Sequence, residues 1–207
     1  MAAMPYLAGI LGLFVLWIVI RVATGTWSIP KLWEGVDKRP SSSKFQFLLW
    51  TAAIIFGYLA IYAAPTWEGG KPHFHFDPLL NFDANLFIAM GISGATAVAA
   101  KAITASNVAN GKTKTTYVAP AAPLAEGAPA AASNIQGGVF QADDGSPDLG
   151  KIQMIAWTLI AVGIFLVGVI HNVDPQSVTR TLPDIGRPLM ILMGLGHATY
   201  VGKKIAE

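Results

Sequence analysis

Five long stretches without a charged side chain constrain the fold of this chain more than any other feature. They are Tyr6–Ile20, Phe45–Ala64, Leu86–Ala100, Ile152–Ile170 and Leu189–Val201. A helix needs about 20 apolar residues to cross a bilayer. The second and fourth stretches approach or reach that length, and the others need flanking residues to complete a crossing. The fifth is the weakest, because Arg187 stands just before it. The pattern predicts an all-α membrane protein with about five transmembrane helices.

Composition agrees with a membrane protein. Hydrophobic residues make up 53% of the 207 residues and charged residues only 13%, whereas soluble domains carry about 25% charged residues. The chain therefore lacks the polar side chains that would cover a water-facing fold, and we expect the lipid bilayer to be its main partner. The net charge of +2 and the lack of a basic run argue against a nucleic-acid partner. Without cysteine, the chain can form no disulfide and no thiolate metal site.

The first apolar stretch resembles either a cleaved signal peptide or a retained anchor. A signal peptide begins with basic residues, but here the first basic residue, Arg21, follows the apolar run. We therefore expect residues 1–24 to form an uncleaved N-terminal transmembrane anchor.

The distribution of lysine and arginine predicts the orientation, because these residues concentrate in cytoplasmic loops. Five basic residues lie between Arg21 and Lys44, whereas the connection between the second and third stretches has only Lys71. Further basic residues flank the central loop and close the chain: Lys101, Lys112, Lys114, Lys151, Lys203 and Lys204. We expect the N-terminus outside and the C-terminus in the cytoplasm.

Two sequence motifs occur twice. The segment KFQFLLWT, Lys44–Thr51, returns as KIQMIAWT, Lys151–Thr158, at an offset of 107 residues. LFIAMGISGATAVAAK, Leu86–Lys101, aligns without gaps on LMILMGLGHATYVGKK, Leu189–Lys204, and eight of the sixteen positions are identical. We interpret this as duplication of a two-helix hairpin. Because two spans return the chain to its starting side, the copies form a parallel repeat and not an inverted one.

The duplication divides the chain into segments. The anchor is followed by a cytoplasmic loop over residues 25–43, a first hairpin over 44–103, and a second hairpin over 151–207. Residues 104–150 are rich in alanine and proline, which predicts a flexible cytoplasmic linker. A small folded element within NIQGGVFQADDGSPD is a weaker alternative for its last part. Ser41–Ser43 and Asp148 precede the two hairpins, at positions typical of N-caps.

Polar residues of the repeated motifs are candidates for contacts between helices. A glutamine facing lipid alone is costly, so it is expected to hydrogen-bond to a neighbouring helix. One interpretation is structural, and the other is the lining of a pore or ligand pocket. The candidates are Gln46, Thr51, Thr96, Gln153, Thr158, His197 and Thr199. Lysine and tryptophan at helix ends are expected to anchor the interface, namely Lys44, Trp50, Lys101, Lys151, Trp157 and Lys204.

Small residues recur at every fourth position of the second helix in each hairpin. Such stripes let helix backbones approach closely in lipid. We expect these helices to pack against each other or against another protomer through Gly91, Ala95, Ala99, Gly194, Ala198 and Gly202.

Histidines raise two further hypotheses. His197 replaces Gly94 of the first repeat, and an ionisable residue within a membrane helix indicates function by default; a place near headgroup depth is the alternative. In the outer loop, HFHFD puts His73, His75 and Asp77 on one face of an extended segment, with His171 expected on the same side. These four residues are candidate metal ligands; otherwise the loop's phenylalanines dip into the interface.

The two hairpins resemble a group of uncharacterised bacterial membrane proteins. That group shows a polar lead-in, Ser-x-x-Lys/Arg-φ-Gln-φ-φ-φ-Trp-Thr, followed by a helix with Leu/Met-Gly-φ-Ser/Gly-x-Ala/Gly-Thr, where φ is apolar. Here these motifs are EGVDKRPSSSKFQFLLWT, MGISGAT and MGLGHAT. The resemblance covers both hairpins and implies the bacterial inner membrane, but it implies no activity.

No catalytic motif accompanies these features. SSSK matches Ser-x-x-Lys without its partner motifs, and no GxSxG, HExxH or phosphate-binding loop is present. We therefore expect a non-enzymatic scaffold or anchor without a cofactor, acting as a homo-oligomer or as a subunit of a membrane complex. The alternative is an oligomeric channel or small transporter whose path runs near Gln46, Gln153, Thr96, Thr199 and His197.

Overall fold

The computed structural model describes residues 3–25, 28–35, 40–68, 71–73, 84–110, 139–141, 147–174 and 181–206. Helices account for most of them, which confirms the predicted all-α fold. The α-helices in these ranges are α1 (Met4–Thr24), α2 (Ser42–Tyr62), α3 (Ala84–Ala109), α4 (Leu149–Val173) and α5 (Arg187–Ala206). A 3-10 helix, η1, covers Ile29–Trp33. A short antiparallel hairpin after α2 pairs β1 (Thr66–Glu68) with β2 (Lys71–His73).

Four of these helices, α1 to α4, are long and apolar enough to cross a membrane. This indicates a multi-pass membrane protein. The fifth predicted span forms a helix as expected, but α5 carries Arg187 in its first turn and Lys203 and Lys204 in its last, so its apolar part is shorter.

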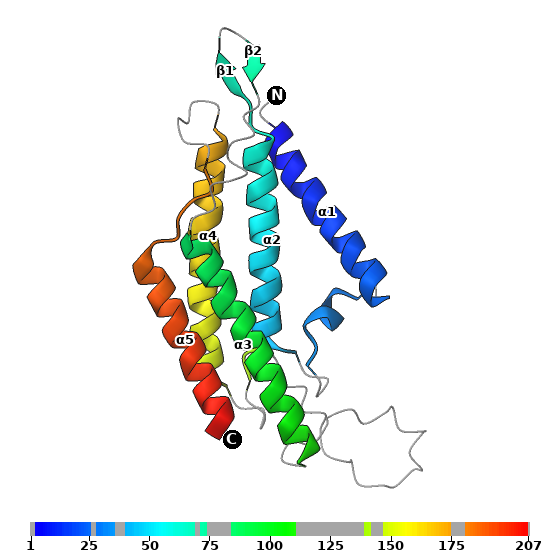
Figure 1. Cartoon of the computed structure of the whole chain (residues 1–207), viewed down its shortest axis with the longest axis vertical. Helices are drawn as coiled ribbons and strands as arrows, with labels where there is room; N and C mark the ends of the chain where they lie inside the picture. Colours follow the sequence, from blue (N-terminus) through cyan, green and yellow to red (C-terminus); the bar gives the residue numbers. More distant parts are fainter. Residues whose placement is uncertain are drawn as a thin grey trace.

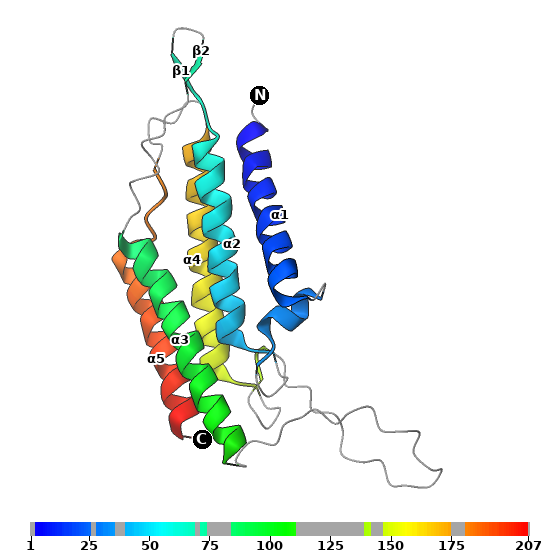
Figure 2. The same cartoon turned by 45° about the vertical axis from the view of Figure 1, so that its right-hand side comes forward.

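The helices form one bundle with α1 at its edge (Figures 1 and 2). Helices α2 and α4 run in the same direction, side by side, and α3 and α5 run back along them. Helix α1 packs on α2. The end of the bundle at which α2 and α4 begin carries Lys44 and Lys151. We call it the lysine end, and the hairpin of β1 and β2 lies at the opposite end.

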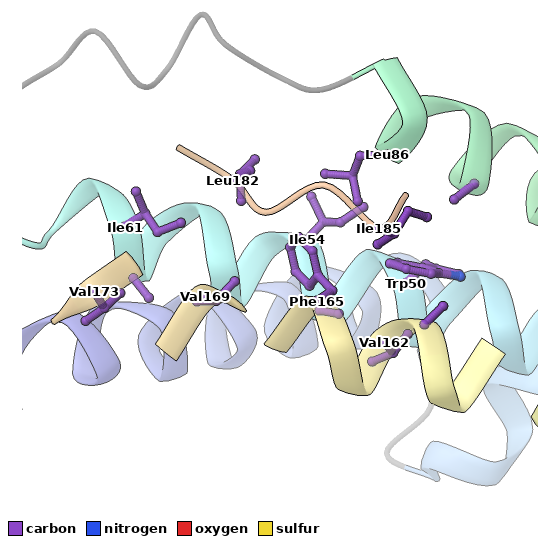
Figure 3. Close-up of a cluster of buried hydrophobic side chains, with 14 of the residues drawn as sticks. Trp50, Ile54, Ile61, Leu86, Val162, Phe165, Val169, Val173, Leu182 and Ile185 are labelled. Atoms are coloured by element: carbon purple, nitrogen blue, oxygen red, sulfur yellow. The ribbon is translucent and has the colours of Figure 1, made fainter. Parts of the chain in front are cut away.

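The apolar core lies between α2 and α4 and extends to the start of α3 (Figure 3). Trp50 and Phe165 meet edge to face, with ring centroids 6.2 Å apart. A close approach of the two helices occurs at Gly57, where an added Cβ would lie 2.8 Å from Cγ2 of Val169. Only glycine therefore fits this contact without displacement of its neighbours.

Helix α1 packs on α2 through two further glycines. A Cβ on Gly9 would lie 2.6 Å from the ring of Phe56, and one on Gly12 would lie 2.1 Å from Cδ1 of Leu59. The remaining face of α1 is exposed and apolar, as a lipid-facing anchor requires.

Both predicted N-caps are confirmed. The Ser41 hydroxyl accepts a hydrogen bond from the Lys44 backbone N–H at 3.4 Å. The Asp148 carboxylate accepts from the backbone N–H groups of Gly150 at 2.9 Å and Lys151 at 3.2 Å. The more complete cap belongs to the second repeat.

The duplicated unit begins upstream of these caps. An isolated β-bridge pairs Glu34 with Pro40, and another pairs Gln141 with Pro147, 107 residues later. In each copy the lysine side chain of the first helical turn donates to the carbonyl oxygen ten residues before it: Lys44 to Glu34, and Lys151 to Gln141. The lead-in loops therefore belong to the repeat.

Two segment boundaries need correction. Helix α3 continues to Ala109, so the first hairpin does not end at residue 103. The predicted linker also ends before residue 150, because residues 139–141 and 147–148 form the lead-in and touch the first repeat: the Ser42 hydroxyl donates to the carbonyl oxygen of Val139 at 2.6 Å. Residues 111–138 of the predicted linker lie outside the described residues.

Candidate functional site

A seam of side chains on α2 is buried between the two repeats. Its members are spaced alternately four and three residues apart, the heptad spacing by which one helix faces another. All five are buried, and Gln46, Trp50 and Ala60 are fully so. The α2 seam consists of Gln46, Trp50, Ala53, Gly57 and Ala60.

The second repeat covers this seam with large side chains. Cζ of Phe165 lies 3.0 Å and Cγ2 of Val169 2.8 Å from the position of a Cβ on Gly57. Both residues are fully buried. Small residues on α2 thus accept large residues of α4, which allows dense packing where lipid removes the hydrophobic drive.

The equivalent seam on α4 is open. Adding 107 to each position of the α2 seam gives Gln153, Trp157, Ile160, Ile164 and Val167. Trp157 is partly buried and Gln153 is exposed. The exposed fractions of Ile160, Ile164 and Val167 are 46%, 50% and 68%. We call these five residues the α4 seam.

Within both hairpins, a glycine of the second helix lies near the same position of the first helix. In the first, a Cβ on Gly94 would lie 3.5 Å from the ring of Phe47; in the second, a Cβ on Gly196, the equivalent of Ser93, would lie 3.2 Å from Cα of Met154, the equivalent of Phe47. The contact is therefore shifted by one residue, and Met154 is fully buried whereas Phe47 is 43% exposed. The two repeats meet through different faces, which makes the interface between them heterologous.

The second helices of the hairpins show the same asymmetry. Thr96 on α3 is buried, whereas its equivalent Thr199 on α5 is exposed. Ala100 is buried, whereas its equivalent Lys203 is exposed and pairs with Asp148. Thr96 and Ala100, which are buried on α3, thus have exposed equivalents on α5.

Several polar side chains are buried within the bundle, in its half toward the lysine end. Gln46, Trp50, Ser93 and His197 each have a buried polar atom for which the described residues provide no hydrogen-bond partner. These atoms are both amide atoms of Gln46, Nε1 of Trp50, Oγ of Ser93 and Nε2 of His197. Nδ1 of His197 lies 2.8 Å from the carbonyl oxygen of Met193. If Nδ1 carries the proton, Nε2 is left as an acceptor.

The threonines of the motifs bond within their own helices. Thr51, Thr96, Thr158 and Thr199 each donate to the carbonyl oxygen four residues earlier, at 2.8 to 3.0 Å. Their predicted role as hydrogen-bond links between helices is therefore not what the structure shows. Back-bonding satisfies a hydroxyl locally, which is common for threonine inside helices.

A hydrogen bond between Asn85 and Asp184 was not predicted from the sequence. Nδ2 of Asn85 donates to Oδ1 of Asp184 at 2.9 Å, which links the start of α3 to the segment before α5. Leu86 and Ile185, their neighbours, lie beside Ile54 (Figure 3), which is about 18 Å from the first residue of α2. Asp184 therefore lies far from either end of α2, although no predicted span contains an acidic residue. The clue in the sequence was that Asp184 stands just before the fifth apolar stretch, in a segment broken by a proline and a glycine.

Non-helical backbone, residues 181–186, precedes α5. The carbonyl oxygen of Thr181 accepts from Nδ2 of Asn172 at 2.8 Å, and Oδ1 of Asp184 accepts from the Gly186 N–H at 3.0 Å. Pro183 lies against Gly168, where a Cβ would be 2.6 Å away. These contacts satisfy backbone groups that lipid could not.

Most residues of the two stripes of small residues lie outside the contact between α3 and α5. Gly91, Ala95, Ala198 and Gly202 are exposed, and no atom of the described part of the chain lies within 4 Å of a Cβ placed on Gly91 or Gly202. The closest approach is at Gly194, 3.8 Å from Ile92. Ala99 is partly buried. Helices α3 and α5 thus pack against each other as expected, but the exposed stripe residues do not make the contact. Packing against another protomer stays a prediction.

The predicted interface anchors divide into two groups. Trp50 is fully buried against Phe165, so it does not face the interfacial belt, and Trp157 is only partly buried. Lys44 and Lys151 fasten the lead-in loops. Lys101 is exposed and Lys204 partly so, as interface anchors require.

The candidate metal ligands are not brought together in the described residues. His73 and His171 are described and exposed, and His75 and Asp77 lie outside the described part. Among the described side chains no three histidine or acidic groups are close enough to hold a metal ion.

Comparison with protein-family models, with curated proteins and with solved structures finds no match for this chain.

Proposed function

We propose that this protein is a non-enzymatic membrane scaffold that binds other transmembrane segments through the α4 seam. One observation carries the proposal: the seam that is buried on α2 is open on α4, with the same spacing and with larger apolar side chains. From Gln153 to Val167 the seam is about 21 Å long, enough to contact a partner helix through most of the hydrocarbon core.

Site-specific photo-crosslinking in native membranes tests this function. A photoreactive benzophenone amino acid at Ile164 is expected to form an adduct with a membrane protein. The matched control carries the same amino acid at Phe14, which is 53% exposed on α1, and is expected to give no comparable adduct. A seam without any protein adduct would contradict the scaffold function.

A channel or small transporter is the second candidate. Two observations favour it: the four side chains with buried polar atoms that have no hydrogen-bond partner among the described residues, and the exposed Asn85–Asp184 contact, whose neighbours Leu86 and Ile185 lie beside Ile54. Of the residues predicted to line a path, Gln46, Thr96 and His197 are buried, but Gln153 and Thr199 are exposed. A path within one protomer would therefore involve Ser93 and Trp50 instead of those two.

Flux into liposomes separates the two candidates. Potassium, chloride and proton fluxes are measured for the reconstituted protein and for His197→Ala and Gln46→Ala. A scaffold gives no flux above that of empty liposomes. Flux that both substitutions abolish would favour the channel.

A further inference from the structure

The repeat offers an internal example of what covers the seam. On α2, the seam is covered by a helix of the same chain that runs in the same direction, α4. The structure thus contains one example of a seam with this spacing that is covered by a parallel helix with large apolar residues. Every copy of the chain contains such a helix, α4.

Helix α1 restricts how copies can join. In a continued head-to-tail array, α2 of one protomer would dock on the α4 seam of another, in the way that α4 docks on the α2 seam. The face of α2 that would make this contact includes Ile55, because the equivalent residue of α4, Val162, lies in the core between the repeats. Helix α1 already covers it: Cγ2 of Ile55 lies 3.2 Å from a Cβ on Gly12. The anchor therefore caps the first repeat, as terminal elements cap repeat arrays.

With that side capped, a closed pair is the simplest arrangement that covers the open seam. A two-fold axis along the membrane normal places two α4 helices parallel, each seam on its equal. The last three residues of the seam, Ile160, Ile164 and Val167, are apolar, exposed and β-branched, so their side chains lose little rotamer freedom when they pack against a partner. The Gln153 side-chain amide can both donate and accept a hydrogen bond, so the Gln153 side chains of two protomers can bond to each other across the axis.

From these observations we infer that the partner of the α4 seam is a second copy of this chain, bound as a parallel two-fold dimer through Trp157, Ile160, Ile164 and Val167. The inference rests on the proposed scaffold function and names its partner. Helix α1, in this arrangement, stops assembly at two protomers on this face.

Disulfide cross-linking tests the dimer, and the natural chain has no cysteine to interfere. Identical positions meet only near a two-fold axis, so Ile164→Cys is expected to form a covalent dimer on mild oxidation in native membranes. Leu159→Cys is the matched control, because Leu159 is also 50% exposed on α4 but lies off the seam. It is expected to form at least tenfold less dimer.

The outcomes are distinct. A seam-specific disulfide dimer, together with a photo-adduct of twice the protomer mass at Ile164, supports the inference. A photo-adduct of another mass without disulfide dimers overturns self-pairing but leaves the scaffold function in place. Equal dimer formation at Leu159 and Ile164 indicates random collision and overturns the inference. Absence of both adduct and dimer overturns the inference and the scaffold function together.

Discussion

Nζ of Lys203 lies 3.0 Å from Oδ2 of Asp148, and this ion pair joins the last turn of α5 to the N-cap of α4. The first repeat has the uncharged Ala100 and Ser41 at the equivalent positions, so these two residues cannot form such a pair. Asp148 is buried whereas the Lys203 side chain is 42% exposed. The second hairpin is therefore closed at the lysine end by a contact that the first hairpin lacks at these positions.

This ion pair predicts an acid-sensitive hairpin. Burial alone would raise the pKa of Asp148, but the hydrogen bonds from Lys203 and the Lys151 N–H, with the charges of both lysines, hold it below 3.8. Because the pKa is lower in the folded state, the stabilisation is present above about pH 4 and is lost as pH falls through the folded pKa. Thermal unfolding in detergent micelles between pH 6 and 2 measures this loss.

Asp148→Asn is the matched variant for this effect, since asparagine still caps the helix but carries no charge. The melting temperature of the variant is expected to depend less on pH than that of the natural chain over this range. The same pH dependence in both proteins would show that Asp148 is not its source.

Gly57, the one glycine of α2, is not expected to tolerate a larger side chain. A larger side chain there meets Val169 and Phe165, so Gly57→Leu overpacks the contact between the repeats and lowers the free energy of unfolding by about 1–3 kcal/mol. Gly91→Leu is the control, because its Cβ position has no atom of a described residue within 4 Å. Melting temperatures in detergent compare the two. A tolerated Gly57→Leu would show that the helices do not approach closely at this position.

Gln46 and Gln153 occupy equivalent positions but are expected to respond differently to replacement by methionine. The Gln46 amide is fully buried and finds no hydrogen-bond partner among the residues that the structure describes, so Gln46→Met removes a desolvation cost and raises stability by about 1–3 kcal/mol. Gln153 is exposed, and Gln153→Met changes the stability of the protomer by less than about 0.5 kcal/mol. Destabilisation by Gln46→Met would instead indicate that the amide is bonded in the membrane, as a hydrated path requires.

The predicted orientation is tested with single cysteines in the cysteine-free chain. His73 and Lys204 lie at opposite ends of the bundle. With the N-terminus outside, His73→Cys is expected to react with a membrane-impermeant maleimide in intact cells, and Lys204→Cys only in inverted vesicles. The reverse pattern would show the opposite orientation.

Helix α1 is expected to limit assembly. Gly12→Leu places a side chain where Leu59 already lies, which displaces α1 and uncovers Ile55 on α2. Native mass measurement of detergent-extracted complexes is expected to show species larger than a dimer. A variant that remains a dimer while its α1 becomes accessible to protease would contradict the capping role.

The sequence by itself determined the helices, the duplication and the caps, because these depend on local features. Apolar length specifies the helices, and matched motifs reveal the repeat. Ser41 and Asp148 cap the backbone within three residues of themselves. The two lead-in loops also share a short sequence pattern: a proline, then the capping residue, then a lysine three residues later.

Only the tertiary structure decided which copy of each motif is buried. Gln46 and Gln153 occur in nearly identical segments, yet one is inside and the other outside, because a heterologous contact uses a different face of each repeat. Trp50 likewise lies in the core and not at the expected interfacial place. Asp184, although exposed, follows residues 181–183 to the level of Ile54 through non-helical backbone that no apolar window predicts. A repeated sequence specifies a repeated unit, but burial depends on which neighbour each copy meets.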